Sequence, residues 1–171
     1  MERVLVIGPS GSGKSTVARE LGSALGINVI HLDAVFWNPG WIETPRPQFR
    51  EAVQELVKGE SWIMDGSYSN TLDIRLPEAE TVVFLDLPRR TCLWRVVRRR
   101  LQYRGRSRPD IAPGCPERLT WELLKWIWDY PRNQRPRTLE FLDQYAEGRR
   151  IVRLGSAQEI DNFIAEVKGV T

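Results

Sequence analysis

The feature that most constrains the fold of this chain is a glycine-rich segment near its start, GPSGSGKST at residues 8–16. It matches the phosphate-binding loop pattern of a glycine, four further residues and then Gly-Lys-Ser. Residues 4–7 before it form an apolar run typical of a buried strand, and the apolar residues within 17–25 recur at helical spacing. A phosphate-binding loop requires this strand–loop–helix setting, which argues against a chance glycine-rich turn.

The loop predicts ATP and Mg²⁺ as ligands. Its glycines allow the backbone to wrap a phosphate, with successive N–H groups pointing inward, and the helix start adds partial positive charge. We expect Lys14 to reach the β- and γ-phosphates and the Ser15 hydroxyl to ligate Mg²⁺. The predicted nucleotide-binding residues of the loop are Gly8, Ser10, Gly11, Ser12, Gly13, Lys14, Ser15 and Thr16.

The composition favours one globular domain over residues 1–171. No apolar run approaches the ~20 residues that a membrane span requires. The first strand follows directly on the first three residues, which leaves no room for a signal peptide. Cys92 and Cys115 form no cluster with metal-binding spacing, which favours reduced thiols and a cytoplasmic location.

Five short apolar strands alternate with helices along the chain. This alternation predicts an α/β fold with an open parallel sheet and helices on both of its faces. The ligand then belongs at the carboxyl edge of the sheet, where we expect the strand-ending acids Asp33, Asp65 and Asp86 to converge. The predicted strands are residues 4–7, 28–32, 61–66, 81–86 and 150–154, and residues 34–46 are predicted to be an irregular loop.

Arginine outnumbers lysine 21 to 4, and its distribution is uneven. Nine arginines fall within residues 89–108, and no acid lies between Asp86 and Asp110. Such a cluster is consistent with polyphosphate binding, with nucleic-acid binding or with a solvated helix face.

Several further segments resemble the adenylate-kinase-related P-loop proteins known as topology modulation proteins. They are residues 31–33, 36–41, 62–69, 84–89, 103–110 and 114–118, so the resemblance covers nearly the whole chain. It implies a P-loop nucleoside triphosphate hydrolase fold of the nucleoside/shikimate-kinase type, with a five-stranded sheet in the order 2-3-1-4-5 and a mobile lid. The family name also suggests a link to DNA topology.

The resemblance implies roles for two of the strand-ending acids. In adenylate-kinase-like enzymes an acid followed by glycine holds Mg²⁺ through water, and Asp65-Gly66 matches that pattern, although Asp65 alternatively caps a turn. Asp33 lies where related kinases place an acid that orients or deprotonates the acceptor hydroxyl, and its alternatives are a turn cap or the outer shell of the metal. His31 is interpreted as structural, pointing away from Asp33.

The predicted acceptor site contains aromatic and cationic side chains. Trp37 and Trp41 either stack on a planar acceptor or pin their loop to the core. Tyr68 and Arg75 follow Asp65, and the Arg75 guanidinium suits an anionic acceptor. On the nucleotide side, relatives pack the adenine ring against the backbone after the last strand. This resemblance places Gly155 beside the adenine base.

The resemblance also implies that the arginine-rich region is a lid over roughly residues 98–135. Arginines carried by a closing lid stabilise charge on the transferring phosphoryl group. Within the cluster, Arg99, Arg104 and Arg108 are the predicted catalytic cations.

These features together predict a phosphotransferase that moves the γ-phosphate of ATP to an unidentified small-molecule or nucleotide acceptor. One alternative is an ATP-dependent regulator that binds nucleic acid through its arginines, and another is an ATPase switch. The protein is expected to act away from membranes, as a monomer or homodimer.

Overall fold

The computed structural model of the chain describes residues 1–106 and 108–169. Ser107, inside the predicted lid, and residues 170–171, at the end of the predicted domain, lie outside the described residues. The described helices include none that is both long enough and apolar enough to cross a membrane.

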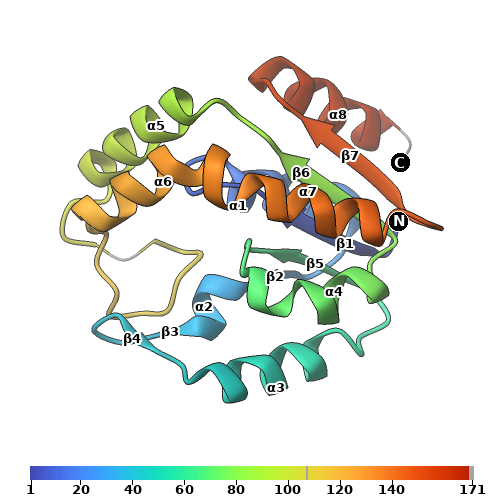
Figure 1. Cartoon of the computed structure of the whole chain (residues 1–171), viewed down its shortest axis with the longest axis horizontal. Helices are drawn as coiled ribbons and strands as arrows, with labels where there is room; N and C mark the ends of the chain where they lie inside the picture. The colour runs from blue at the N-terminus through green and yellow to red at the C-terminus, as the bar shows by residue number, and fades with distance from the viewer. Residues whose placement is uncertain (107, 170–171) are drawn as a thin grey trace.

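A five-stranded parallel sheet forms the centre of the molecule (Figure 1). Its order is β2-β5-β1-β6-β7, which is 2-3-1-4-5 when only the strands of this sheet are numbered. The predicted α/β fold and strand order are therefore confirmed. The strands are β1 (Arg3–Ile7), β2 (Val29–His31), β5 (Trp62–Asp65), β6 (Thr81–Leu85) and β7 (Arg150–Leu154).

The central strand β1 explains why the sheet is covered on both sides. Successive side chains of a strand point to opposite faces. Val4 and Val6 accordingly pack into one apolar cluster, whereas Leu5 and Ile7 pack into another. All four side chains are buried, so β1 reads as a continuous apolar run, as in other two-sided parallel sheets.

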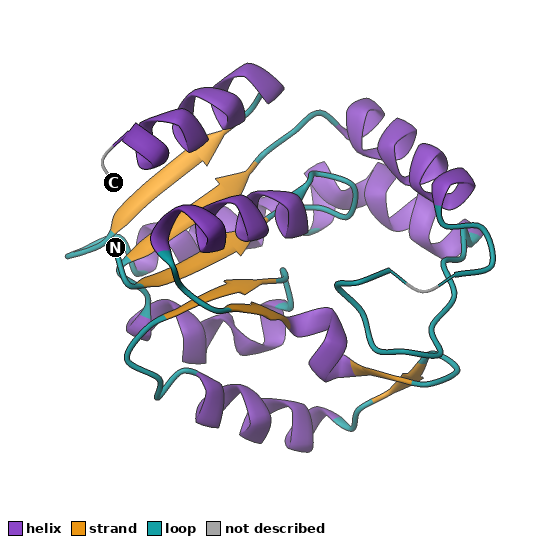
Figure 2. Ribbon diagram, turned by 180° about the vertical axis from the view of Figure 1, so that it is seen from behind, coloured by secondary structure: helices purple, strands orange, loops and turns teal. Residues whose placement is uncertain are grey.

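The helices divide into two layers that bury these two clusters (Figures 1 and 2). The cluster around Val4 is covered by α1 (Lys14–Leu25), α5 (Arg89–Gln102), α6 (Trp121–Asn133) and α8 (Ala157–Gly169). The cluster around Leu5 is covered by α2 (Leu32–Phe36), α3 (Arg46–Leu56), α4 (Leu72–Glu78) and α7 (Arg135–Gln144), with the 3-10 turn η1 (Ser69–Thr71) before α4.

The region after β2 is more ordered than its composition predicts. Residues 34–46 were expected to be irregular, yet α2 begins at Leu32, and β3 (Trp37–Asn38) and β4 (Ile42–Glu43) form an antiparallel hairpin. Leu32, Val35 and Phe36 pack into the same apolar cluster, and their spacing of three and four residues suits one helical face. Asp33 therefore lies in the first turn of a helix rather than at the end of a strand.

The described parts of the segment between α5 and α6, residues 103–106 and 108–120, cross the mouth of the fold. In Figure 1 this yellow and tan segment runs from the end of α5 to the β3–β4 hairpin and back to α6. Helix α6 starts at Trp121, where the Thr120 hydroxyl caps it by accepting from the Leu123 N–H at 3.2 Å. The helix continues through Pro131 to Asn133.

Candidate functional site

The glycine-rich loop lines a cavity of 740 Å³ at the carboxyl edge of the sheet. Gly11 and Gly13 have φ of 81° and 99°, in the left-handed region that favours glycine. A Cβ atom on Gly11 would also collide with the Cys92 carbonyl of α5. The loop can therefore adopt this curve against α5 only with glycine at that position. Residues 10–16 line the cavity, whereas Gly8 is buried beneath the loop.

Hydrogen bonds from neighbouring elements hold the loop in shape. The Gly8 N–H donates to Ser67 Oγ at 2.9 Å, and Arg95 Nη1 of α5 donates to the Ser12 carbonyl at 2.9 Å. Lys14 Nζ donates to the Pro9 carbonyl at 3.1 Å, across the loop. Burial lowers the pKa of Lys14, although Asp33 and Asp65 act in the opposite direction. These contacts hold the loop in a curve that can receive a phosphate.

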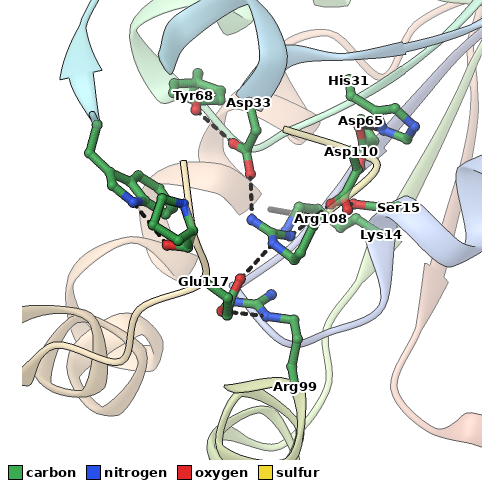
Figure 3. Close-up of polar contacts among 12 residues, drawn as sticks. Lys14, Ser15, His31, Asp33, Asp65, Tyr68, Arg99, Arg108, Asp110 and Glu117 are labelled. Carbon is green, nitrogen blue, oxygen red and sulfur yellow. Dashed lines mark hydrogen bonds and ion pairs between the residues drawn. The ribbon is translucent and has the colours of Figure 1, made fainter. Parts of the chain in front are cut away.

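The predicted metal side of the site contains one unexpected residue. Ser15 Oγ donates to Asp110 Oδ2 at 2.9 Å, and Asp110 comes from the segment that crosses the mouth of the fold (Figure 3). Burial raises the pKa of Asp110, but Arg108 and Ser15 more than offset this effect, so the pKa lies below its usual value. Asp110 is therefore held as a carboxylate beside the hydroxyl that was predicted to bind Mg²⁺.

Asp65 is 4% exposed and pairs with His31, whose Nδ1 lies 2.6 Å from Asp65 Oδ1. The two residues are register partners on β2 and β5. Burial acts to lower the pKa of His31, but the hydrogen bond and the charge of Asp65 outweigh it and raise the pKa above 6.5. His31 was interpreted as structural, and in the structure it orients the acid predicted to serve the metal.

Asp33 lines the cavity opposite the loop and keeps 38% of its side chain exposed. The Tyr68 hydroxyl donates to Asp33 Oδ1 at 2.7 Å. Arg108 Nη2 lies 3.6 Å from Asp33 Oδ2. One carboxylate oxygen is thus fixed by a tyrosine, and the other faces a cation from the predicted lid (Figure 3).

Arg108 is the centre of a charged cluster that closes the site (Figure 3). Besides Asp33, it binds Asp110 Oδ2 through Nη1 at 2.7 Å and Glu117 Oε2 through Nε at 2.7 Å. Arg99 Nε donates to the other oxygen of Glu117 at 2.9 Å. Burial and the nearby Arg108 lower the pKa of Arg99. We call Asp33, Arg99, Arg108, Asp110 and Glu117 the lid cluster.

Four of the predicted acceptor residues lie outside the lining of the cavity. Arg75 is fully buried and donates to the carbonyls of Gly66 and Tyr68 and to Thr71 Oγ1. Its prediction as an acceptor ligand needs correction, because its guanidinium is enclosed by the backbone that it supports. The Tyr68 ring packs between Phe36 and Phe49, and its hydroxyl serves Asp33.

Trp37 and Trp41 pack edge to face in the β3–β4 hairpin rather than against the cavity. Trp41 Nε1 donates to the Pro116 carbonyl at 3.0 Å, and the Arg118 guanidinium lies 4.5 Å from the centre of its ring. The Gly40 N–H donates to the Gly114 carbonyl at 2.9 Å. The tryptophans thus match the alternative interpretation, in which they pin their loop. The hydrogen bonds here anchor the hairpin to residues 114–118.

Three other predicted positions also differ. Arg104 is exposed and outside the cavity lining, so it does not join Arg99 and Arg108. The Gly155 N–H donates to Glu159 Oε2 at 2.8 Å, and α8 lines the cavity instead of Gly155. Asp86 does not converge on the site, because Arg135 and Arg153 bind its carboxylate at the β6–β7 edge.

Sequence reasoning passed over Asp110, Glu117 and Arg95 as site residues. A signal for the two acids was present, since they are the first acids after Asp86 and follow nine arginines. Their function as counter-charges for that cluster was therefore predictable. Arg95 carried no separate signal, because nothing in the sequence shows which arginines of α5 face the loop.

The donor atoms at the loop fit a nucleotide-bound Mg²⁺. Ser15 supplies a hydroxyl oxygen, and Asp65 and Asp110 supply carboxylates, which are the oxygen ligands that Mg²⁺ prefers. Within residues 1–106 and 108–169, no three His, Cys, Asp or Glu side chains are grouped to hold a metal. Phosphate oxygens would complete the coordination, as is usual for Mg²⁺ at such loops.

Solved structures of several small kinases have this fold. Shikimate kinase from Acinetobacter baumannii, solved with shikimate, has a TM-score of 0.64 and 16% identity, covering 99% of this chain and 92% of its own. A gluconokinase from Sinorhizobium meliloti has a TM-score of 0.56 and 21% identity, covering 98% and 90%. Deoxyadenosine kinase from M. mycoides has a TM-score of 0.54 and 12% identity, covering 98% and 99%.

These likenesses establish a P-loop kinase fold, and their low identities carry no substrate to this chain. No curated protein sequence matches the chain. Because the family model of the AAA domain matches residues 4–114, more than half of the 171 residues, the protein belongs to that AAA domain family.

Proposed function

We propose that the protein is an ATP-dependent phosphotransferase that moves the γ-phosphate of ATP to a small-molecule or nucleotide acceptor. The observation that carries this proposal is the shared lining of one cavity. The phosphate loop with Lys14, the carboxylate of Asp33 and the guanidinium of Arg108 all face it. A phosphate cradle, a candidate base and a cation are the parts that phosphoryl transfer uses.

The loop side would hold the triphosphate. Lys14 would contact the β- and γ-phosphates, and Ser15 and Asp65 would hold Mg²⁺, with Asp65 acting through water. When bound, Mg²⁺ neutralises charge on the phosphate oxygens. The bond from His31 occupies one oxygen of Asp65 and leaves the other available for that water. Where the adenine base of the nucleotide would lie, α8 contributes Ala157 and Ile160 to the cavity wall.

Asp33 is the candidate general base. Tyr68 fixes its Oδ1, so the carboxylate presents Oδ2 toward the cavity and Arg108. An acceptor hydroxyl that displaces Arg108 from this oxygen would donate its proton there as the hydroxyl oxygen attacks the γ-phosphorus. The bond from the γ-phosphorus to the β,γ-bridging oxygen would break in the same transfer, and ADP would leave with that oxygen. The proposed acceptor is therefore an alcohol or a phosphate group small enough to enter between the loop and α2.

Arg99 and Arg108 are the proposed cations for the transferring phosphoryl group. Both form ion pairs with carboxylates, and Arg108 is divided among three of them. A triphosphate presents a higher charge density to Arg108 than any of these groups, so it competes for the guanidinium when it binds. Positive charge delivered in this way stabilises the transition state.

The test is a screen of nucleotides, sugars and small alcohols as acceptors, in which ATP consumption and acceptor phosphorylation are both measured. Lys14→Ala is expected to abolish transfer, and undiminished transfer in that variant would refute the proposal. Hydrolysis that no acceptor displaces would instead indicate an ATPase switch. Asp73→Asn is the matched control, because Asp73 pairs with Arg50 outside the cavity.

The outward arginines favour one second candidate, an ATP-dependent regulator that binds nucleic acid, in line with the resemblance to topology modulation proteins. Arg104 and Arg106 are exposed and lie outside the cavity lining, and no ion pair joins them to a carboxylate in the described part of the chain. Phosphate contacts would make binding fall steeply with salt. Charge reversal of these two arginines should weaken nucleic-acid binding and preserve ATP affinity, whereas a flat salt response would exclude this candidate.

A further inference from the structure

The contact between Asp110 and Ser15 has no explanation in the general plan of the site. The two residues are separated by 95 positions in the chain, and their side chains meet at 2.9 Å. Asp110 is buried, and its second polar partner is Arg108 at 2.7 Å. The segment between α5 and α6 therefore places a carboxylate directly on the hydroxyl that was predicted to bind the metal.

The separation of these oxygens suits shared coordination. Mg²⁺ takes near-ideal octahedral geometry with bonds of 2.0–2.1 Å, so two neighbouring ligand oxygens lie about 2.9 Å apart. Ser15 Oγ and Asp110 Oδ2 already have that spacing. A cation would bind to both oxygens without moving either backbone, once the Ser15 proton turns away from Asp110.

A further carboxylate lines the same cavity, since Asp65 borders it together with Ser15 and Asp110. His31 pairs with one oxygen of Asp65. Arg108 Nη1 donates to Asp110 Oδ2 at 2.7 Å, so this oxygen would be shared between the guanidinium and the cation. One or two carboxylates together with phosphate oxygens are a usual ligand set for Mg²⁺.

We propose that Asp110 is a second carboxylate ligand of the divalent cation that accompanies the nucleotide. This inference rests on the proposed placement of ATP and Mg²⁺ at the loop. In this structure, the Ser15–Asp110 hydrogen bond holds the same two oxygens together. Ser15 and Asp110 would together hold the cation, and residues 108–117 would thereby be linked to the phosphate loop.

This arrangement makes nucleotide binding depend strongly on the cation. Without the metal, the Asp110 carboxylate faces the phosphate oxygens and repels them. With the metal, the same carboxylate attracts the complex. Removing the charge of Asp110 should therefore weaken binding of the metal-loaded nucleotide and leave the metal-free nucleotide bound equally or more tightly.

The experiment is calorimetric titration with a non-hydrolysable ATP analogue, in Mg²⁺ and in EDTA. Asp110→Asn is expected to weaken binding in Mg²⁺ by about tenfold, without weakening it in EDTA. Asp73→Asn is the control and should match the wild type in both buffers. Equal weakening of Asp110→Asn in both buffers, or no weakening in Mg²⁺, would overturn the proposal.

A second variant tests direct ligation. Asp110→Cys replaces the carboxylate by a thiolate, which favours soft cations over Mg²⁺. Its affinity for the analogue should be poor in Mg²⁺ and recover in Cd²⁺ relative to the wild type, and a failure of Cd²⁺ to restore it would contradict ligation. Wild-type protein that binds no analogue in Mg²⁺ would refute the proposed function itself, whereas tight wild-type binding with unaltered metal dependence in Asp110→Asn refutes only this inference.

Discussion

Two arginine–carboxylate clusters lie at opposite sides of the sheet edge and differ in what they join. The lid cluster connects α2, α5 and residues 108–117 across the cavity. The second, which we call the edge cluster, consists of Asp86 with Arg135 and Arg153, and it connects β6, α7 and β7. In the edge cluster, β6 and β7 are also paired along a parallel ladder, whereas the lid cluster joins elements that are not strand neighbours.

The two clusters also differ in burial, in an unexpected direction. Arg108 and Glu117 of the lid cluster have side chains 10% and 3% exposed, whereas Arg153 of the edge cluster is 52% exposed. Buried ion pairs are poor sources of stability, because desolvation offsets their attraction. The deeper charges thus lie where an anionic ligand would enter, and the shallower charges lie where the fold needs only modest support.

The largest expected difference between the two clusters is in catalysis. Arg108→Ala should lower kcat/KM for phosphoryl transfer by about 10³-fold, the lower end of the range for an arginine that stabilises a transferring phosphoryl group. Arg135→Ala should change kcat/KM by less than threefold, because Arg135 binds Asp86 away from the cavity. Steady-state kinetics of both variants with the best acceptor would measure this difference. Similar losses of kcat/KM would show that the clusters do not differ in function.

The next effect concerns stability. Glu117→Gln leaves two buried guanidinium groups short of a counter-charge and should lower the free energy of unfolding by about 3 kcal/mol. Arg153→Gln removes a half-exposed partner, while Arg135 still holds Asp86, and should cost less than about 1 kcal/mol. Urea denaturation without nucleotide measures both. The comparison fails if the edge variant is the more destabilised one.

The smallest expected effect is a pH-dependent change in the free energy of unfolding, at the His31–Asp65 pair. The folded-state pKa of His31 is raised above 6.5, so its bond to Asp65 stabilises the fold fully below about pH 6.5, and this contribution is lost as pH rises through the raised pKa. His31→Gln should therefore cost about 1–2 kcal/mol at pH 5.5 and much less at pH 9. Denaturation curves at the two pH values check this, and a cost that is independent of pH would contradict the ion pair.

The sheet and the phosphate loop were predictable because local patterns specify them. The apolar run of residues 4–7 and the glycines after it fix a buried strand and a loop with left-handed positions. Asp33 lines the cavity, but its helix was missed, since three apolar residues of α2 are too few to reveal a helical period. The hairpin was missed because its strands are two residues each.

The side chains of the site were less predictable, because their directions depend on distant contacts. Arg75 and Arg108 look alike in sequence, yet the first is buried against the carbonyls of Gly66 and Tyr68 and the second faces the cavity. The position of Asp110 on Ser15 depends on how residues 108–120 cross the mouth of the fold, which no local spacing specifies.

The hydrogen bonds between the hairpin and residues 114–118 have a thermodynamic consequence, because they can couple the binding affinities of the two proposed substrates. Trp41 and Gly40 join the β3–β4 hairpin to the segment that carries Arg108, Asp110 and Glu117. A nucleotide that strengthens the link between this segment and the loop, as proposed above, would also hold the hairpin more firmly. Binding free energies are reciprocal, so an acceptor that settles the hairpin must raise nucleotide affinity by the same factor by which the nucleotide raises its own.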